Sequence, residues 1–374
     1  MKIMRSVRRV VFLNYMDIKN PLSGGAEEYC FEVAQRLSNL GYEVIWVTRR
    51  FVGAPRVEVL KGVKIIRVGN RFTVYPLAII VTLQLRPDLI FESINVIPFF
   101  TPLFTRKPIL GMIHHIIPHT VIKRKIGWLS FFADFIQLKL LPGLYRETLI
   151  LANSESTEKD LLLLGFKNVR LTQLGVEIPV FQNAPKKSNI IVAAGALRPW
   201  KNPDHILNAF TKVPNDWRLV IFGRPENKKI VPELKRTAQN LGIADRVDIF
   251  ESITNEQRTE LYKISKIAII ASEKEGWGFA AIEPQTFGCP VVGYDVPGIR
   301  DSVKNNITGI LVRGGSIEDL GESLKKLATD NQLYLKLSTN ALQWSHTFTW
   351  EHSVEDFVKA LETVIEAQEV QVTL

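Results

Sequence analysis

Short apolar runs alternate along this chain with segments in which apolar residues recur every three or four positions. The first example is an apolar strand at 10–13, an amphipathic helix with apolar positions from Ala26 to Leu40, and a second strand at 42–48. This order predicts a βαβ unit, whose crossover is right-handed and whose two strands are parallel. Further strands are predicted at 63–68, 88–91, 109–113, 149–152, 190–194, 219–222, 247–250, 267–270, 290–292 and 308–312. The chain is therefore predicted to be an α/β protein.

The alternation is interrupted at 180–189, where the sequence becomes polar and contains a proline. We interpret this segment as a linker, because 374 residues are too many for one ordinary hydrophobic core. The linker predicts an N-terminal domain at 1–180 and a second domain at 181–350. Both domains repeat the strand–helix pattern, so each is expected to be Rossmann-like, with its own parallel sheet.

One stretch, from Ser272 to Gly293, combines more signals than any other. A buried strand is followed by two glycines, Gly276 and Gly278, then by an apolar helical turn and another strand. Such a turn exposes backbone N–H groups at the positive end of a helix, where a phosphate can bind. Two carboxylates, Glu275 and Glu283, flank the turn. A paired-carboxylate hydrolase is one interpretation, but a helical spacing of about 12 Å favours contacts to different parts of one long ligand.

The full run, Glu-x₇-Glu with Glu-Gly-x-Gly-Phe and then Gly-Cys-Pro-Val-Val at 288–292, resembles the donor-site signature of retaining glycosyltransferases of family 4. The resemblance extends over nearly the whole chain. It implies the GT-B fold, in which two Rossmann-like domains with parallel sheets face an interdomain cleft. It further implies that the first domain holds the acceptor and the second holds the nucleotide-sugar donor. It also implies that a closing helix at about 351–369 packs back on the first domain. The implied reaction moves a hexosyl group from a UDP- or GDP-sugar to an acceptor, with retention of anomeric configuration.

The resemblance implies roles for individual residues of the second domain. Glu275 would orient the sugar, Lys201 would stabilise the leaving diphosphate, and Glu283 would hold the ribose. The backbone N–H groups of Gly278 and Phe279 would bind phosphate. The other expected donor contacts are Gly24, Gly25, Gly223, Gly276 and Trp277.

Two positions depart from the family pattern. The family usually places an arginine directly after the glycine at 195, where this chain has Ala196; Arg198 is expected to supply the missing charge. In the first domain His114 follows a predicted strand and would lie near the sugar. His115 stands where the family often has an aspartate, which leaves open which of the two histidines faces the sugar.

The excess of positive charge lies in the first half of the chain. Residues 1–185 contain 24 Lys+Arg against 14 Asp+Glu, whereas residues 186–374 contain 23 against 24. A basic half implies an anionic partner, such as nucleic acid, an acidic membrane surface or a phosphorylated or lipid-linked acceptor. We expect no nucleic acid, because no helix-turn-helix, zinc or RNA-recognition signature accompanies the charge.

The segment at 119–148 joins a basic triplet, Lys123–Lys125, to a dense aromatic and apolar run. It predicts either peripheral contact with an anionic membrane or, as we favour from the sequence, a core helix of the first domain. No apolar run reaches 18 residues, Cys30 and Cys289 lie far apart, and the start does not resemble a signal peptide. A cytoplasmic protein, with any membrane contact at the inner face, is expected.

No cofactor is expected, and the nucleotide-sugar would be a co-substrate. Since no Asp-x-Asp motif stands in a suitable place, the resemblance implies a metal-independent hexosyltransferase. Two alternatives remain open from the sequence. One is a non-catalytic nucleotide-sugar binding protein, because Ala196 weakens the expected phosphate contacts. The other is a nucleotide-sugar epimerase of GT-B fold.

Overall fold

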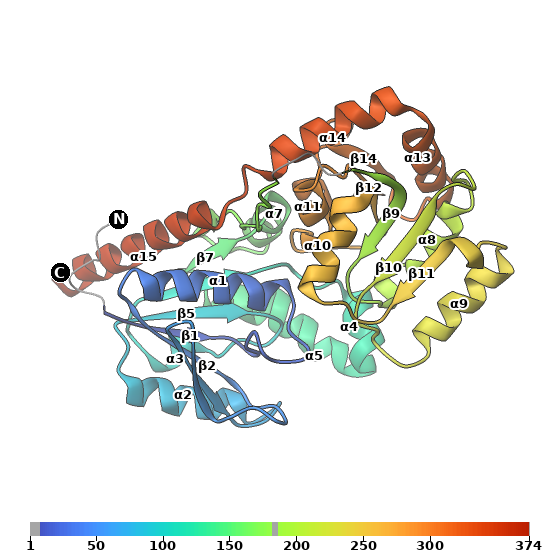
Figure 1. The fold of residues 1–374 in the computed structure, drawn as a ribbon. Coiled ribbons are helices and arrows are strands. Elements are labelled where there is room, and N and C mark those ends of the chain that lie inside the picture. The colour runs from blue at the N-terminus through green and yellow to red at the C-terminus, as the bar shows by residue number, and fades with distance from the viewer. Residues whose placement is uncertain (1–7, 182–185, 374) are drawn as a thin grey trace. The chain divides into compact units, whose positions relative to one another are not determined.

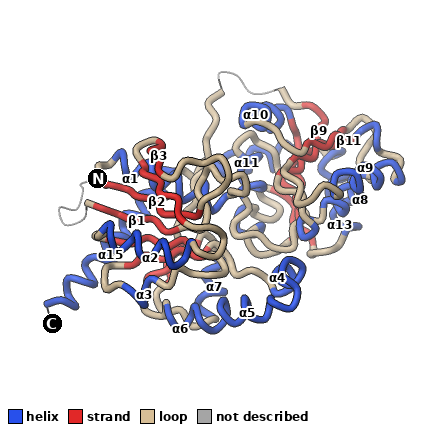
Figure 2. The backbone as a smooth tube through the Cα atoms, turned by 90° about the horizontal axis from the view of Figure 1, so that it is seen from below, coloured by secondary structure: helices blue, strands red, loops and turns tan. Residues whose placement is uncertain are grey.

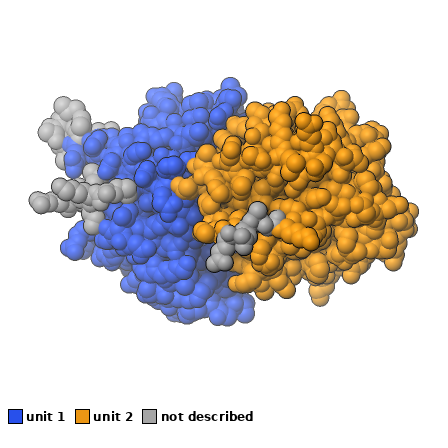
Figure 3. Space-filling model, turned by 45° about the horizontal axis from the view of Figure 1, so that its top comes forward, with its two compact units in different colours: residues 1–175, 350–374 blue, residues 176–349 orange. Residues whose placement is uncertain are grey.

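The computed structural model describes residues 8–181 and 186–373, and the chain forms two compact units (Figures 1 and 3). Unit 1 comprises Met1–Gly175 and Trp350–Leu374, and unit 2 comprises Val176–Thr349. The boundary therefore lies at 175/176, a few residues before the polar segment interpreted as a linker. Residues 182–185 of that segment, and the basic start at 1–7, lie outside the described residues.

Unit 1 is built on an eight-stranded sheet in the order β3-β4-β2-β1-β5-β6-β7-β8. Every neighbouring pair is parallel except β3 and β4, a short antiparallel pair at the edge. The order confirms the predicted βαβ unit, since the first two predicted strands pair in parallel with Val11 opposite Ile45. The strands are β1 (Arg9–Leu13), β2 (Glu43–Arg49), β3 (Val57–Leu60), β4 (Val63–Val68), β5 (Leu89–Ile94), β6 (Ile109–Ile113), β7 (Leu149–Ala152) and β8 (Val169–Leu171).

Helices cover both faces of this sheet (Figures 1 and 2). Alternate residues of each strand point to opposite faces. Phe12 of β1 stacks on Phe357 of the closing helix, whereas Val11 packs in a cluster with Val74 of the helix on the other face. The helical segments are α1 (Gly25–Asn39), α2 (Val74–Leu85), α3 (Thr101–Phe104), α4 (His119–Ile126), the short 3₁₀ helix η1 (Gly127–Leu129), α5 (Ser130–Phe135), the π-helical turn η2 (Ile136–Leu140), α6 (Leu141–Leu144), α7 (Glu155–Leu163) and α15 (Trp350–Thr373).

Unit 2 is built on a six-stranded parallel sheet in the order β11-β10-β9-β12-β13-β14. Its strands match the apolar runs predicted from the sequence, and they are β9 (Ser188–Ala194), β10 (Arg218–Phe222), β11 (Val247–Phe250), β12 (Ser265–Ile270), β13 (Val291–Tyr294) and β14 (Gly309–Val312). Its helices are η3 (Pro199–Lys201), α8 (Pro203–Phe210), α9 (Ile230–Asn240), η4 (Ala244–Arg246), α10 (Asn255–Ile264), α11 (Phe279–Gln285), α12 (Ile299–Ser302), α13 (Ile317–Thr329) and α14 (Asn331–Ser345). Two parallel-sheet α/β units confirm the predicted fold class.

The closing helix α15 packs against α1 and β6, both in unit 1. Trp350 at its start lies against Gly175, where an added Cβ would come within 2.6 Å of the Trp350 backbone nitrogen. The Ser353 hydroxyl donates to the Gln173 carbonyl at 2.7 Å. Helix α15 therefore belongs to unit 1, although it follows unit 2 in the sequence.

The segment at 119–148 corrects one interpretation. We favoured a core helix there because its apolar residues are dense, but most of its aromatic side chains are exposed. Trp128, Phe131, Phe132 and Phe135 are 77%, 80%, 60% and 57% exposed. A dense run of hydrophobic residues shows that burying their side chains would be favourable, but it does not show whether the folded chain buries them. In the part of the chain that the structure describes, no helix is both long and apolar enough to cross a membrane.

Candidate active site

The loop that follows β9 is fastened to the carboxyl end of β12. The Glu273 amide donates to the carbonyl of Trp200 at 2.9 Å, and the Asn202 side-chain amide donates to the carbonyl of Ala271 at 2.9 Å. Lys201, between these two contacts, ends the short helix η3. Parallel sheets bind ligands outside the carboxyl ends of their strands, so this junction places Lys201 where a ligand is expected.

Lys201 and Glu275, 74 residues apart in the sequence, form an ion pair at this junction. The Ser272 hydroxyl donates to the same carboxylate oxygen of Glu275 at 2.6 Å. The side chains of Lys201 and Glu275 are 21% and 15% exposed, so both reach solvent while most of their surface is covered. An ammonium has three donors, so Lys201 can bind Glu275 and a phosphate oxygen together.

The backbone of Glu275 is braced by the turn after β13. The Glu275 amide donates to the carbonyl of Pro297 at 3.1 Å. Gly298, with φ of +84°, lies so close that an added Cβ would come within 2.3 Å of the Glu275 carbonyl oxygen. Only glycine combines this φ with this approach. Gly298 therefore helps to position Glu275, and the sequence analysis did not identify it.

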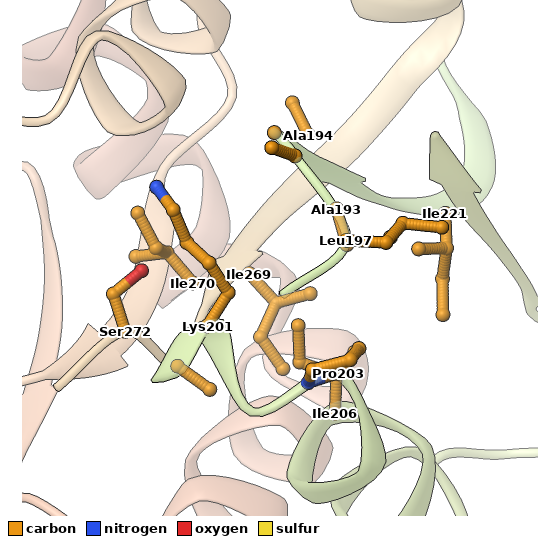
Figure 4. A pocket seen from close by; sticks show the side chains of 13 residues that line it. Ala193, Ala194, Leu197, Lys201, Pro203, Ile206, Ile221, Ile269, Ile270 and Ser272 are labelled. Carbon is orange, nitrogen blue, oxygen red and sulfur yellow. The ribbon is translucent and has the colours of Figure 1, made fainter. Parts of the chain in front are cut away.

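A small hollow that is open to solvent lies beside Lys201 (Figure 4). Apolar side chains form most of its wall, and Lys201 and Ser272 are the labelled side chains that bring polar atoms to it. It is lined by Ala193, Ala194, Gly195, Ala196, Leu197, Lys201, Pro203, Ile206, Ile221, Ile269, Ile270, Ala271 and Ser272.

Gly223, one of the predicted donor contacts, packs against Gly195, which lines the hollow. Gly223, with φ of +152°, lies against Gly195, and an added Cβ would come within 1.9 Å of the Gly195 carbonyl oxygen. A Cβ added to Gly195 would lie 3.8 Å from the Lys201 Nζ atom and 3.9 Å from the Ala280 Cβ atom. Gly223 thus acts through close backbone packing that sets the position of the Gly195 turn.

Arg198 lies over the ring of Trp200, with its guanidinium carbon 5.3 Å from the ring centroid. Burial, and then the nearby positive charge of Arg224, lower the pKa of Arg198. The backbones of the two segments pair, since the Leu197 amide donates to the Arg224 carbonyl at 2.9 Å. The structure therefore brings a second guanidinium, which sequence reasoning missed, close to the predicted one.

Glu283 lies on α11 and has two partners on α10. The Tyr262 hydroxyl donates to one carboxylate oxygen at 3.1 Å, and Arg258 donates to the other at 3.4 Å. Burial raises the pKa of Glu283, while Arg258 and Tyr262 act in the opposite direction. The carboxylate is held in one orientation but keeps lone pairs for further donors.

The residues of the glycine-rich turn before α11 differ in how far they are exposed. Gly276 lies in the loop and is partly exposed, whereas the Trp277 indole is buried against the rings of Phe279 and Phe348. Trp277 could therefore contact a donor only through its backbone. Gly278 adopts φ of +89°, a conformation that favours glycine, and α11 begins at the next residue.

The other predicted residues belong to unit 1. Gly24 precedes α1, Gly25 is its first residue, and the Gly24 amide donates to the Glu27 carboxylate at 2.8 Å. That amide is therefore already bonded within the chain. His114 is 6% exposed, its Nε2 lies 3.4 Å from the Ser93 hydroxyl, and burial lowers its pKa to about 3. His114 is thus a neutral imidazole at neutral pH.

Glu27 makes the stability of unit 1 sensitive to pH. Burial, with a smaller contribution from Asp17, raises the pKa of Glu27 from 4.5 to about 7. Between these values the folded protein holds a proton that the unfolded chain has lost, so stability falls as pH rises from 4.5 to 7. Glu27→Gln keeps an acceptor for the Gly24 amide and does not titrate. Urea unfolding at pH 5 and 7.5 should show that the parent loses roughly 2–3 kcal/mol more than this variant. An equal loss in both proteins would contradict the assignment.

Comparison with known families agrees with this geometry. The model described as "Glycosyltransferase Family 4" matches residues 23–178, and the model described as "Glycosyl transferases group 1" matches residues 177–344. Together they take in most of both units, including the junction of Lys201 and Glu275. The chain belongs to glycosyltransferase family 4. This confirms the resemblance drawn from the motif at 272–293.

Curated relatives of this family 4 chain include two D-inositol 3-phosphate glycosyltransferases. That of Rhodococcus erythropolis is 29% identical over 178 residues, which cover 46% of this chain and 40% of the relative. That of Stackebrandtia nassauensis is 27% identical over 247 residues, which cover 59% and 55%. This chain thus spans about half the length of the curated relatives that it matches.

Solved structures match the fold of the family 4 chain over nearly its whole length. Sucrose-phosphate synthase from Thermosynechococcus elongatus has a TM-score of 0.82 at 18% identity, covering 96% of this chain and all of that one. HepE of Anabaena, in complex with UDP and glucose, has a TM-score of 0.74 at 16% identity and covers 95% of this chain and 100% of HepE. At these identities the likeness establishes the fold, which is GT-B.

Proposed function

We propose that this protein is a retaining hexosyltransferase that uses a UDP- or GDP-sugar as donor. The observation that carries the proposal is the ion pair of Lys201 and Glu275, fixed by Ser272 beside a hollow at the carboxyl ends of β9 and β12. In this proposal Glu275 orients the transferred sugar and Lys201 binds the diphosphate. The bond between the anomeric carbon and the diphosphate oxygen breaks, an acceptor hydroxyl oxygen forms the new bond, and the proton of that hydroxyl passes to the departing diphosphate.

The leaving diphosphate gains negative charge as that bond breaks, and fixed cations lower the energy of this transition state. In our proposal Lys201 supplies the first cation, and Arg198 with Arg224 takes the place of the arginine that is missing at Ala196. Three protein cations would meet the need without a divalent ion, so we expect transfer to continue in the presence of EDTA. Glu283, oriented by Tyr262 and Arg258, would accept hydrogen bonds from the ribose hydroxyls.

We also propose that the acceptor is lipid-linked or phosphorylated, and that this otherwise cytoplasmic protein contacts the inner membrane face peripherally. The support is the basic surplus of residues 1–185, which predicts an anionic partner for that half of the chain. Most of the basic residues of this half belong to unit 1. The family 4 resemblance assigns the acceptor to the same unit.

A thermal-shift screen against UDP, GDP, ADP and their hexose conjugates tests the donor. A ligand at about 100 times its dissociation constant stabilises the folded state by roughly 2.7 kcal/mol, which is measurable as a higher melting temperature. We expect one nucleotide to stabilise the parent protein, and to stabilise Lys201→Ala weakly or not at all. No stabilisation by any nucleotide would overturn the donor assignment.

Product analysis separates the alternatives. A transferase releases nucleoside diphosphate when an acceptor is present, and the anomeric configuration of its product can be read by NMR. An inverted product would overturn the retaining mechanism. Donor binding with neither transfer nor slow donor hydrolysis would identify a non-catalytic binding protein, and conversion of the donor sugar without any acceptor would identify an epimerase.

A further inference from the structure

The helical layer of unit 1 that covers Ile90 and Ile94 of β5 has an unusually apolar outer surface. Ile90 packs with Val74 and Ala78 of α2, and Ile94 packs with Leu141 of α6, so α2 and α6 lie on the same face of the sheet. Figure 2 shows α2, α3, α5 and α6 along this side of the unit. Its exposed large hydrophobic side chains are Phe72, Leu77, Ile80, Leu83, Ile97, Leu103, Trp128, Phe131, Phe132, Phe135 and Leu138.

The helical segment α5–η2 buries its small and polar side chains and exposes its aromatic ones, which is the opposite of an ordinary amphipathic helix. Its buried residues are small or polar, namely Ser130, Ala133 and Gln137. Its outer aromatic residues, with Trp128 just before it, are more than half exposed, and we call Trp128, Phe131, Phe132 and Phe135 the aromatic face. A water-facing surface would favour the opposite arrangement, so the aromatic face is suited to an apolar surrounding.

The aromatic face is held in this orientation by hydrogen bonds. The buried Gln137 side chain accepts from the Ile117 amide at 2.9 Å and donates to the Ile117 carbonyl at 3.0 Å. Rotating the helix to bury its aromatic rings would carry Gln137 outwards and break both bonds. The Ile117 amide and carbonyl would then lose these partners, and leaving such a group unsatisfied when buried costs about 1–3 kcal/mol. The exposure of the rings is therefore built into the fold.

Glu92, on the same face of β5, ties the rest of the layer together. Its fully buried carboxylate accepts hydrogen bonds from the Phe99 amide at 2.5 Å, the Thr101 hydroxyl, and the Tyr145 hydroxyl at 2.9 Å. These donors come from the loop before α3, from α3 itself, and from the residue after α6. Glu92 thus fixes the loop before α3, α3 and the end of α6 to β5.

The segment that builds this surface is basic. Residues 71–146 contain nine Lys+Arg against three Asp+Glu, a net charge of +6. Of the three acids, Glu92 is buried and Asp134 pairs with His119. The basic residues with exposed side chains, which we call the basic rim, include Arg71, Arg86, Arg106, Lys107, Lys123, Arg124 and Lys139.

We propose that this layer is a membrane-docking surface, which seats the aromatic face in the headgroup region of a bilayer and sets the basic rim against anionic lipids. Aromatic rings with neighbouring cations are the arrangement that binds such an interface. A second copy of this chain fits less well, because two surfaces of net charge +6 would repel each other. The inference extends the proposed peripheral contact by naming its surface, but it concerns binding and does not require the transfer reaction.

Vesicle flotation tests the proposal with the full chain. We expect the parent protein to float with phosphatidylcholine vesicles containing phosphatidylglycerol, and to bind pure phosphatidylcholine vesicles at least about tenfold more weakly. Phe131→Ser combined with Phe132→Ser should weaken binding to the anionic vesicles by about tenfold or more. The matched control is Ile307→Ser combined with Leu335→Ser, which removes two similarly exposed hydrophobic side chains from unit 2.

Trp128 supplies an independent readout. Brominated lipids should quench the parent fluorescence, and Trp128→Phe should lose most of that quenching while still floating. Failure of the parent protein to bind anionic vesicles would overturn the proposal, as would unchanged binding by the Phe131/Phe132 variant. A concentration-dependent dimer that the same variant abolishes would also overturn it, in favour of a second copy. Far-UV circular dichroism and the thermal shift with the donor nucleotide show that each variant is folded, and they report on the donor site separately.

Discussion

Lys201→Ala is expected to lower the rate of sugar transfer by about 10²–10³-fold, the usual effect of removing one preorganised group that stabilises developing negative charge. The ammonium of Lys201 is held by Glu275 and by a loop fastened to β12, so it needs little rearrangement when the diphosphate leaves. Steady-state kinetics with the donor identified by the thermal-shift screen measures this effect. The loss should appear in kcat as well as in KM, because the charge that Lys201 balances grows in the transition state.

Lys212→Ala is the matched control, since Lys212 is a lysine of the same unit whose ion pairs with Glu318 and Glu322 are exposed. It should leave transfer unchanged. Glu275→Gln keeps a side chain of the same shape beside Ser272 and removes its charge, and the double variant with Lys201→Ala should lose less than the sum of the two single losses. If Lys201→Ala were folded and transferred sugar within about threefold of the parent rate, its proposed role would be wrong.

Arg67→Met is expected to destabilise unit 1 by about 3–5 kcal/mol, because it leaves the carboxylate of Asp17 buried without its charged partner. The side chains of Arg67 and Asp17 are both fully buried, and they are joined by two hydrogen bonds of 2.8 and 3.0 Å. Calorimetry should show the melting temperature of unit 1 lowered by roughly 6–20 °C. Because Asp17 also accepts from the Lys19 amide, the loop that leads to Gly24 should loosen as well.

Removing both charges together should cost less than removing one. Arg67→Met combined with Asp17→Leu leaves no uncompensated ion, so its melting temperature should lie above that of Arg67→Met alone. Lys167→Met breaks an exposed ion pair with Glu147 and should change stability by less than about 1 kcal/mol. A single variant no less stable than Lys167→Met would show that the buried pair does not stabilise the unit.

The parallel strands and the donor-site motif could be predicted because their signals are local. A buried parallel strand is an apolar run of a few residues, and β1, β5 and β12 are such runs between polar or glycine-rich segments. β3 and β8 escaped prediction because they are short, and each has at most partly buried side chains. A strand of three or four partly exposed residues carries no period that distinguishes it from a loop.

The partners of the candidate site could not be predicted, because they come from distant parts of the chain. Gly298 follows Glu275 by more than twenty residues, and only the packing of the β13 turn shows that it braces the Glu275 backbone. Arg224 follows β10, and only the pairing of β9 with β10 brings it close to Arg198. Nothing in the local sequence of either residue distinguishes it from an ordinary turn residue.

By itself the sequence determined that the protein has two α/β units and belongs to glycosyltransferase family 4, because both conclusions depend on local periods and on one contiguous motif. Only the tertiary structure decided which side chains meet and which face water. Lys201 and Glu275 form a pair because parallel strands bring their carboxyl ends to one edge of the sheet. The aromatic face is exposed on a helix whose inner side is held by the two bonds between Gln137 and Ile117. Whether a helix keeps such hydrogen bonds or buries its aromatic rings depends on what the rest of the folded unit packs against it, and the local sequence does not contain that information.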